Sequence, residues 1–119
     1  ISQNAPFVYG NRRYWLSFPV KLYKFGKNEV ITVKLDRRAA GRVIRSLRRS
    51  RKLSQDVLSG LAGIARTHLS MIETGSKQPN FETLWKLSGA LDIRPSELVG
   101  LIELECEKAE AEERGYEGA

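Results

Sequence analysis

LSQDVLSGLAGIARTHLSMIETG, residues 53–75, is the stretch that decides the fold of this chain of 119 residues. Ser54 suits a helix N-cap, because its hydroxyl can accept from the free N–H groups of the first turn. Apolar residues then recur at helical spacing in two short stripes. The stripes consist of Val57, Leu58 and Leu61, and of Ile64, Leu69 and Ile72. Gly60 and Gly63 flank the place where the chain must turn and two helices approach closely, and Gly75 suits the end of the second helix. The stretch therefore predicts two short helices joined by a tight turn.

The second of these helices has one polar side. Arg66, Thr67, Ser70 and Met71 lie between its apolar positions, so we expect them to point outward. A helix-turn-helix that reads DNA needs this pattern, since a buried face fixes the angle between the helices and an open face meets the base edges.

The charge of the chain is divided unevenly along its length. The formal net charge is +6. Residues 103–119 hold seven Glu against Lys108 and Arg114 and contribute −5, so residues 1–102 carry +11. A field of that sign attracts a polyanion such as the phosphate backbone of DNA, although membrane surfaces and RNA attract basic proteins too.

The N-terminal third of the chain shows the period of a β-strand rather than that of a helix. Residues 1–10 have no period and are expected to be irregular. Apolar residues alternate over Leu16–Leu22 and again over Ile31–Leu35, with turn residues at 26–28 between them. This pattern predicts a β-hairpin over about 15–35. The hairpin could pack on the helical region, exchange between subunits, or bind a partner.

Three more helices are expected around the central stretch. The first runs over 36–51 with Asp36 as its cap, and the next starts at Asn80, after Pro79. The last starts at Pro95, which suits a first helical turn. We expect the inward side chains of the first two to be Ala40, Val43, Ile44 and Leu47, and Phe81, Leu84, Leu87, Ala90 and Leu91. The glutamate-rich segment after about Lys108 is either a solvated helix extension or disordered.

Residues 40–99 resemble the Cro/phage-repressor helix-turn-helix family, also called the xenobiotic-response-element family. The matching segments are Ile44–Arg48, Leu53–Gln55, Leu61–Ile64, Leu69–Gly75 and Leu84–Leu98, in the family's order and spacing. The resemblance implies a five-helix domain, similar to that of lambda repressor, that binds DNA, usually as a dimer on a two-fold operator. The expected fold is therefore mainly α, with an N-terminal hairpin extension over 1–35, the DNA-binding domain over 36–102 and an acidic helix extension or tail over 103–119.

The same resemblance implies roles for individual residues on the recognition helix. Arg66, Thr67, Ser70 and Met71 match the positions that read bases. Arg66 could fork onto the O6 and N7 atoms of a guanine or clamp a phosphate, and the two roles are evenly balanced. Ala65 departs from the family, where a capping Ser or Thr is usual. The residues expected to contact the DNA backbone are Gln55, His68, Lys77, Gln78, Asn80 and Arg45.

Two further sets of residues are expected to be structural. The resemblance implies that Arg48 and Glu73 form an ion pair between the first helix and the end of the recognition helix. Leu98, Leu101, Ile102 and Trp85 could form a two-fold dimer interface, or they could close the core of one subunit.

The sequence thus predicts a sequence-specific DNA-binding transcriptional regulator, a repressor that binds a two-fold operator as a homodimer. One alternative is the antitoxin of a toxin–antitoxin pair, whose hairpin or acidic tail binds the toxin. Another is a restriction–modification controller, which differs only in its operator and neighbouring genes.

An enzyme is disfavoured, because the sequence has no nucleophile–base pair and no phosphate-binding loop. His68 is the only histidine and Cys106 the only cysteine, so neither a metal site nor an internal disulfide is expected. No cofactor is expected either. No apolar run reaches the roughly 20 residues of a membrane span and no signal peptide is visible, so a cytoplasmic location is expected.

Overall fold

The computed structural model describes the backbone of residues 4–9, 12–17, 24–25, 29–30 and 33–117, and the side chains of residues 33–115. The chain divides into two compact units, Ile1–Thr32 and Val33–Ala119. The first unit contains two short antiparallel pairs of strands. β1 (Asn4–Tyr9) pairs with β2 (Arg12–Ser17), and β3 (Lys24–Phe25) pairs with β4 (Glu29–Val30).

The hairpin predicted over 15–35 is not supported. Residues 4–9, which we expected to be irregular, form a strand, and residues 33–35 are not in a strand. The remaining parts of the two predicted strands, 18–23 and 31–32, lie outside the described residues. The alternation of apolar side chains predicted a strand period, but alternation does not determine which segments pair.

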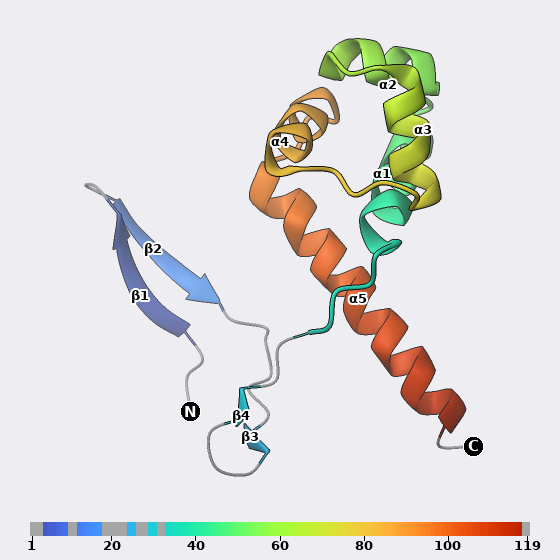
Figure 1. Ribbon diagram of the computed structural model, residues 1–119. Coiled ribbons are helices and arrows are strands. Elements are labelled where there is room, and N and C mark those ends of the chain that lie inside the picture. Colours follow the sequence, from blue (N-terminus) through green and yellow to red (C-terminus); the bar gives the residue numbers. More distant parts are fainter. Residues whose placement is uncertain (1–3, 10–11, 18–23, 26–28, 31–32, 118–119) are drawn as a thin grey trace. The chain divides into compact units, whose positions relative to one another are not determined.

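The second unit is built from five helices in the described part of the chain (Figure 1): α1 (Ala39–Ser50), α2 (Gln55–Ala62), α3 (Arg66–Thr74), α4 (Phe81–Ala90) and α5 (Pro95–Glu117). α1 packs against α3 and α5, and α2 packs against α3 and α4. α5 also packs against α4, and its C-terminal part extends beyond the four shorter helices. The boundary expected at 102–103 therefore falls within one continuous helix.

The caps predicted for α2 and α4 are present, whereas the one predicted for α1 is not. The Ser54 hydroxyl accepts from the Val57 N–H at 3.1 Å, and the Asn80 side-chain oxygen accepts from the Thr83 N–H at 2.8 Å. Gly63 ends α2 and begins the tight turn to α3. Its φ of 69° lies in the left-handed region, which residues with a side chain disfavour. α1 begins three residues later than predicted, and Asp36 accepts instead from the Arg38 N–H, at 3.0 Å, just before the helix.

One apolar core holds the helical unit together. Its fully buried side chains come from all five helices or from their ends: Ile44, Leu58, Leu69, Ile72, Leu87, Leu91 and Leu98. Burial of one such side chain stabilises the domain by about 1.5–3 kcal/mol, because it removes a large apolar surface from water. Among the residues that the structure describes, no helix has both the length and the hydrophobicity needed to cross a membrane.

Three apolar residues that we expected in the core are exposed: Val57, Leu61 and Phe81. The buried face of α2 is formed by Leu58, Ser59 and Ala62, so Val57 and Leu61 lie beyond its edge. In α4 the buried positions are Thr83, Leu87 and Ser88, which leave Phe81 outside.

We expected the helices to approach closely between Gly60 and Gly63, but a Cβ at either glycine would meet nothing within 4 Å. The close approach lies instead at Gly41 in α1, where a Cβ would clash with the backbone carbonyl oxygen of Ile72.

Candidate nucleic-acid interface

α3 presents a polar side to solvent because its opposite side is anchored in the core. Leu69, Ile72 and Glu73 are the buried residues of this helix. The tight turn after α2 and the packing of α1 against α3 hold it in place. The remaining residues of the helix are exposed or half-buried.

The four residues expected to read bases lie together on that face. Arg66 and Thr67 occupy the first turn and are exposed, and Met71 is exposed one turn later. Ser70 is half-buried beside them. Arg66 and Ser70 are four residues apart, as are Thr67 and Met71, so the four side chains form two neighbouring rows on one face that could enter a groove of duplex DNA.

The start of α3 has no side-chain cap. Ala65 is the N-cap residue and its methyl group cannot accept a hydrogen bond, which agrees with its departure from the family pattern. The N–H groups of the first turn of α3 therefore receive no side-chain cap from Ala65, and an anionic oxygen could accept from them.

Arg66 has a neighbour that the sequence analysis missed. Its Nε lies 3.4 Å from Oδ1 of Asp56, the second residue of α2. The two residues are ten positions apart and no short-range pattern links them. The only signal in the sequence is an acidic side chain near the start of the first short helix, a stretch that is otherwise uncharged from Leu53 to Ala65.

The ion pair predicted between Arg48 and Glu73 is present and nearly buried. Nε and Nη2 of Arg48 donate to the two oxygens of Glu73 at 2.9 and 2.8 Å. Nη1 of Arg48 donates to the carbonyl oxygen of Leu53 at 2.8 Å. The hydrogen bonds with Glu73 raise the pKa of the Arg48 guanidinium above its ordinary value, against the effect of burial. This fork joins α1 and the end of α3 in one geometry and neutralises a carboxylate that would otherwise repel phosphate.

Some of the side chains expected to contact the DNA backbone are exposed to solvent, and others form hydrogen bonds within the protein. Lys77 and Arg45 are exposed, and His68 is half-buried on α3. Gln55 is the first residue of α2, so its backbone N–H is available, but its side-chain amide donates to Glu73 Oε1 at 3.3 Å.

Two of these side chains already serve a role inside the protein. The amide of Gln78 donates to the Arg37 carbonyl oxygen, and the side-chain oxygen of Asn80 caps α4. Both residues are nevertheless exposed, so their contact with the DNA backbone stays a prediction.

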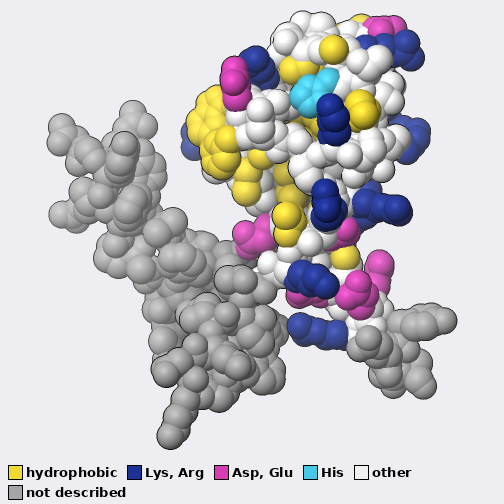
Figure 2. All heavy atoms as spheres, in the orientation of Figure 1, with side chains coloured by type: hydrophobic (Ala, Val, Ile, Leu, Met, Phe, Trp, Pro, Cys, Tyr) yellow, Lys and Arg dark blue, Asp and Glu magenta, His cyan; other side chains and the backbone are white. Residues whose placement is uncertain are grey.

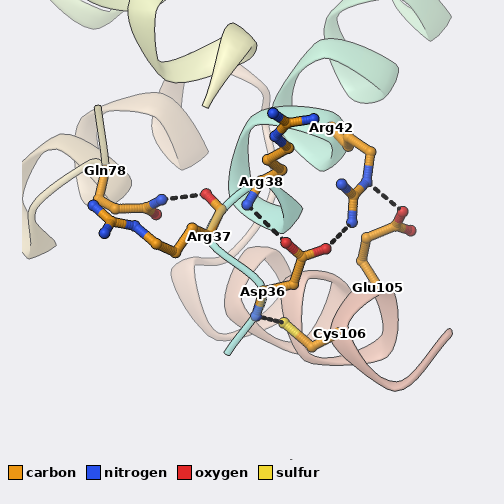
Figure 3. A network of polar contacts seen from close by, with 7 residues as sticks. All are labelled: Asp36, Arg37, Arg38, Arg42, Gln78, Glu105 and Cys106. Carbon is orange, nitrogen blue, oxygen red and sulfur yellow. Dashed lines mark hydrogen bonds and ion pairs between the residues drawn. The ribbon is translucent and has the colours of Figure 1, made fainter. Parts of the chain in front are cut away.

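The segment before α1 is tied to α5 by a polar network that sequence reasoning did not find (Figure 3). Asp36 accepts from Arg42 through its side chain and donates its backbone N–H to the Cys106 sulfur at 3.4 Å. Arg42 also donates to Glu105 at 2.9 Å. The hydrogen bond from Arg42 lowers the pKa of Asp36 below its ordinary value, and the Arg38 N–H lowers it further. The network and the Gln78 contact connect the segment before α1 to both α5 and the loop after α3.

The residues expected at a dimer interface do not share one surface. Leu98 is fully buried and Ile102 nearly so, in the core of their own subunit, and they are therefore not available for a second copy. Trp85 and Leu101 are exposed. Trp85 stacks on Phe81 with ring centroids 5.8 Å apart. Figure 2 shows hydrophobic side chains gathered on the side of the domain where Figure 1 places α4.

Comparisons with known proteins agree with this geometry. The family described as Helix-turn-helix (HTH_3) matches residues 44–98. The immunity repressor protein of Bacillus phage phi105 is 38% identical over 60 residues, which make up 50% of this chain and 42% of the repressor. The uncharacterized HTH-type transcriptional regulator y4dJ of Sinorhizobium fredii is 33% identical over 63 residues, 53% of this chain and 82% of that protein. This chain thus aligns with less than half of the phage repressor.

Solved structures share the same helical domain. The restriction-modification controller protein C.AhdI from Aeromonas hydrophila is 35% identical with a TM-score of 0.51, over 52% of this chain and 94% of that one. The clp gene regulator ClgR from Corynebacterium glutamicum has the same fold, with a TM-score of 0.65 over 72% of this chain and 92% of its own, at 22% identity.

The chain belongs to the helix-turn-helix family of DNA-binding transcriptional regulators. Members of this family are regulators and not enzymes.

Proposed function

We propose that this protein is a sequence-specific repressor that places α3 in the major groove of its operator. The observation that carries the proposal is the open face of α3, where Arg66, Thr67, Ser70 and Met71 lie side by side while the opposite face is buried. Side chains of this kind suit base edges, because Arg can fork onto guanine and the methyl groups of Thr and Met can contact thymine.

Phosphate contacts would position the domain and supply much of the affinity. The N-terminus of α2 with the backbone N–H of Gln55, and the exposed Lys77 after α3, lie on either side of the base-reading helix in sequence. The charge of +11 on residues 1–102 supports a strong attraction to DNA that weakens as salt is added.

The test is selection of bound sequences from a pool of random duplexes, followed by binding assays at several salt concentrations. We expect one enriched motif. Arg66→Ala should remove the preference at one base position, whereas Lys77→Ala should weaken all sequences about equally and reduce the salt dependence by about one contact. A wild-type protein that binds every duplex equally at low ionic strength would contradict the proposal.

A homodimer on a two-fold operator follows as the finer part of the proposal. Phe81 and Trp85 are 72% and 58% exposed, and a stacked aromatic pair of that exposure is a suitable centre for a two-fold interface. Two copies would place their α3 helices about 34–36 Å apart, in successive major grooves. The pair alone covers less than the roughly 800 Å² per partner of a stable interface, so DNA would assist dimerisation.

Light scattering with and without operator DNA tests the dimer. We expect Trp85→Glu to abolish the dimer, while Val57→Gln, which changes an exposed apolar residue on α2, leaves it intact. A Trp85→Glu protein that still binds the operator as a dimer would place the interface elsewhere, with Leu101 as the next residue to substitute.

A restriction–modification controller is a second candidate within the same class. The similarity to C.AhdI over 94% of that chain supports it. The selected operator would then lie beside genes for a restriction enzyme and a methyltransferase. The antitoxin alternative stays a prediction, and co-purification of a small basic protein encoded next to this one would test it.

A further inference from the structure

The ion pair between Asp56 and Arg66 joins the two helices of the helix-turn-helix at the side that faces solvent. Asp56 lies in the first turn of α2 and Arg66 is the first residue of α3. Both side chains are well exposed, 74% for Asp56 and 63% for Arg66, so the pair lies on the surface that the proposed function assigns to DNA.

The ion pair involves Nε of Arg66 and not the two terminal amino groups of the guanidinium. Oδ1 of Asp56 lies 3.4 Å from Nε, the nitrogen nearest the arginine stem. A guanidinium is planar and carries its donors in a rigid fork, so a carboxylate beside Nε attracts the group toward α2 without occupying the two terminal amino groups. A guanine accepts from a pair of such donors through O6 and N7.

We propose that Asp56 is a positioning residue that holds Arg66 for a bidentate contact with guanine. The inference rests on the proposed function and deepens it, because it decides between the two roles that the sequence left open for Arg66. An arginine that clamps a phosphate would gain nothing from a carboxylate nearby, since the carboxylate repels the same phosphate. For an arginine that reads a base, a nearby carboxylate favours the contact, because it restricts the position of the guanidinium before binding.

Asp56 also acts against unspecific binding. A carboxylate in the first turn of α2 lies where a phosphate is expected, and its charge lowers the affinity for any duplex. The contact between Arg66 and the correct base offsets this loss of affinity, whereas a wrong base does not. Discrimination is raised by a repulsive element as well as an attractive one.

The pair contributes little to the stability of the free domain, because exposed ion pairs are worth about 0–1 kcal/mol. A change in base preference on removal of the pair can therefore be measured without a large change in the stability of the domain. An alternative role for Asp56, to stabilise the N-terminus of α2 as an acidic residue in a first helical turn, would change the melting temperature and leave base preference unchanged.

Glu82 offers a matched control. It is the second residue of α4, as Asp56 is of α2, it is 75% exposed, and it pairs with Lys86 at 3.1 Å. Glu82→Gln removes the same charge from the same position of a helix, away from α3. The experiment compares full-length wild type, Asp56→Asn, Arg66→Ala, the double variant and Glu82→Gln, in competitive binding to the selected operator and to four duplexes that differ only at the base read by Arg66.

We expect Asp56→Asn to reduce the preference for guanine at that position about two- to fivefold and to increase the affinity for unrelated duplexes. The double variant should show the same base preference as Arg66→Ala alone, because Asp56 acts through Arg66. Glu82→Gln should keep the wild-type preference, and the melting temperatures of Asp56→Asn and Glu82→Gln should agree.

Three outcomes would overturn the inference, and they differ in what they say about function. An unchanged guanine preference in Asp56→Asn, with a clear preference in the wild type, overturns the role of Asp56 alone. An equal loss on all four duplexes for Arg66→Ala makes Arg66 a phosphate clamp and leaves sequence-specific binding in place. A wild type without any base preference overturns the proposed function and the inference together.

Discussion

Removal of the Glu73 carboxylate is the sharpest test of how the recognition helix is held. Its side chain is 2% exposed, and it accepts two hydrogen bonds from Arg48, which is 11% exposed. The amide of Gln55 donates to the same carboxylate. Glu73→Ala therefore leaves a nearly buried guanidinium without its counter-ion, and one amide without its acceptor.

The expected loss follows from the burial of the pair. Breaking a buried ion pair from one side destabilises a protein by about 3–5 kcal/mol, mainly because a buried charge is left uncompensated. We expect a value near the lower end, about 3 kcal/mol, because Arg48 keeps its hydrogen bond to the Leu53 carbonyl and has some contact with water. For a domain of this size, about 3 kcal/mol corresponds to a fall in melting temperature of roughly 12–24 °C.

Thermal and urea unfolding of the full chain, followed by circular dichroism, measure this loss. Glu82→Ala removes a carboxylate that is 75% exposed and should change the stability by less than about 0.5 kcal/mol. The double variant Arg48→Met/Glu73→Leu should be more stable than Glu73→Ala, because an apolar pair leaves no unpaired charge. Equal melting temperatures for Glu73→Ala and Glu82→Ala would refute the reasoning. So would a double variant whose loss of stability equals the sum of the losses measured for Arg48→Met and Glu73→Leu alone.

Three further changes test other parts of the structure. Gly41→Ala should lower the stability by about 1–3 kcal/mol, since its Cβ would clash with a backbone carbonyl of α3, whereas Gly100→Ala, with nothing within 4 Å, should raise it by about 0.5–1 kcal/mol; equal effects in thermal melts would contradict the close packing of α1 on α3. Ser54→Ala should destabilise the domain by about 1 kcal/mol through loss of the α2 cap, and Ser54→Asn should restore it. The pKa of Asp36 is lowered by its hydrogen bond with Arg42, so its contribution to stability is present above its ordinary value of 3.8 and is lost as pH falls through the lower folded value. Asp36→Asn should therefore be less stable than wild type at pH 7 and approach it in acid, and parallel curves of stability against pH would contradict this.

The helix ends and the polar face of α3 could be predicted from short stretches of sequence. Ser54 and Asn80 cap their helices with bonds to the backbone three residues ahead, and Gly75 adopts the left-handed conformation that ends α3. These features depend on atoms within one helical turn, so the neighbouring residues are sufficient to specify them. The N-terminal strands depend on pairing between segments, and the hairpin predicted over 15–35 is not supported, although β3 and β4 flank the turn predicted at 26–28.

The burial of individual apolar residues depended on more than their spacing. Val57 and Phe81 have the correct helical phase for a wide apolar face, but the faces that α2 and α4 bury are narrower and leave both exposed. The width of a buried face is set by the helices packed on it, which the periodicity of one segment does not contain.

The sequence by itself therefore determined that two short helices meet at a tight turn and that the second has an open polar side, because caps, glycines and periodicity act locally. Only the tertiary structure decided that Asp56 meets Arg66, that Gly41 allows α1 to approach α3, and that Leu98 and Ile102 belong to the core of one subunit. Each of these facts depends on how different helices pack on one another, which the local pattern of one helix does not contain.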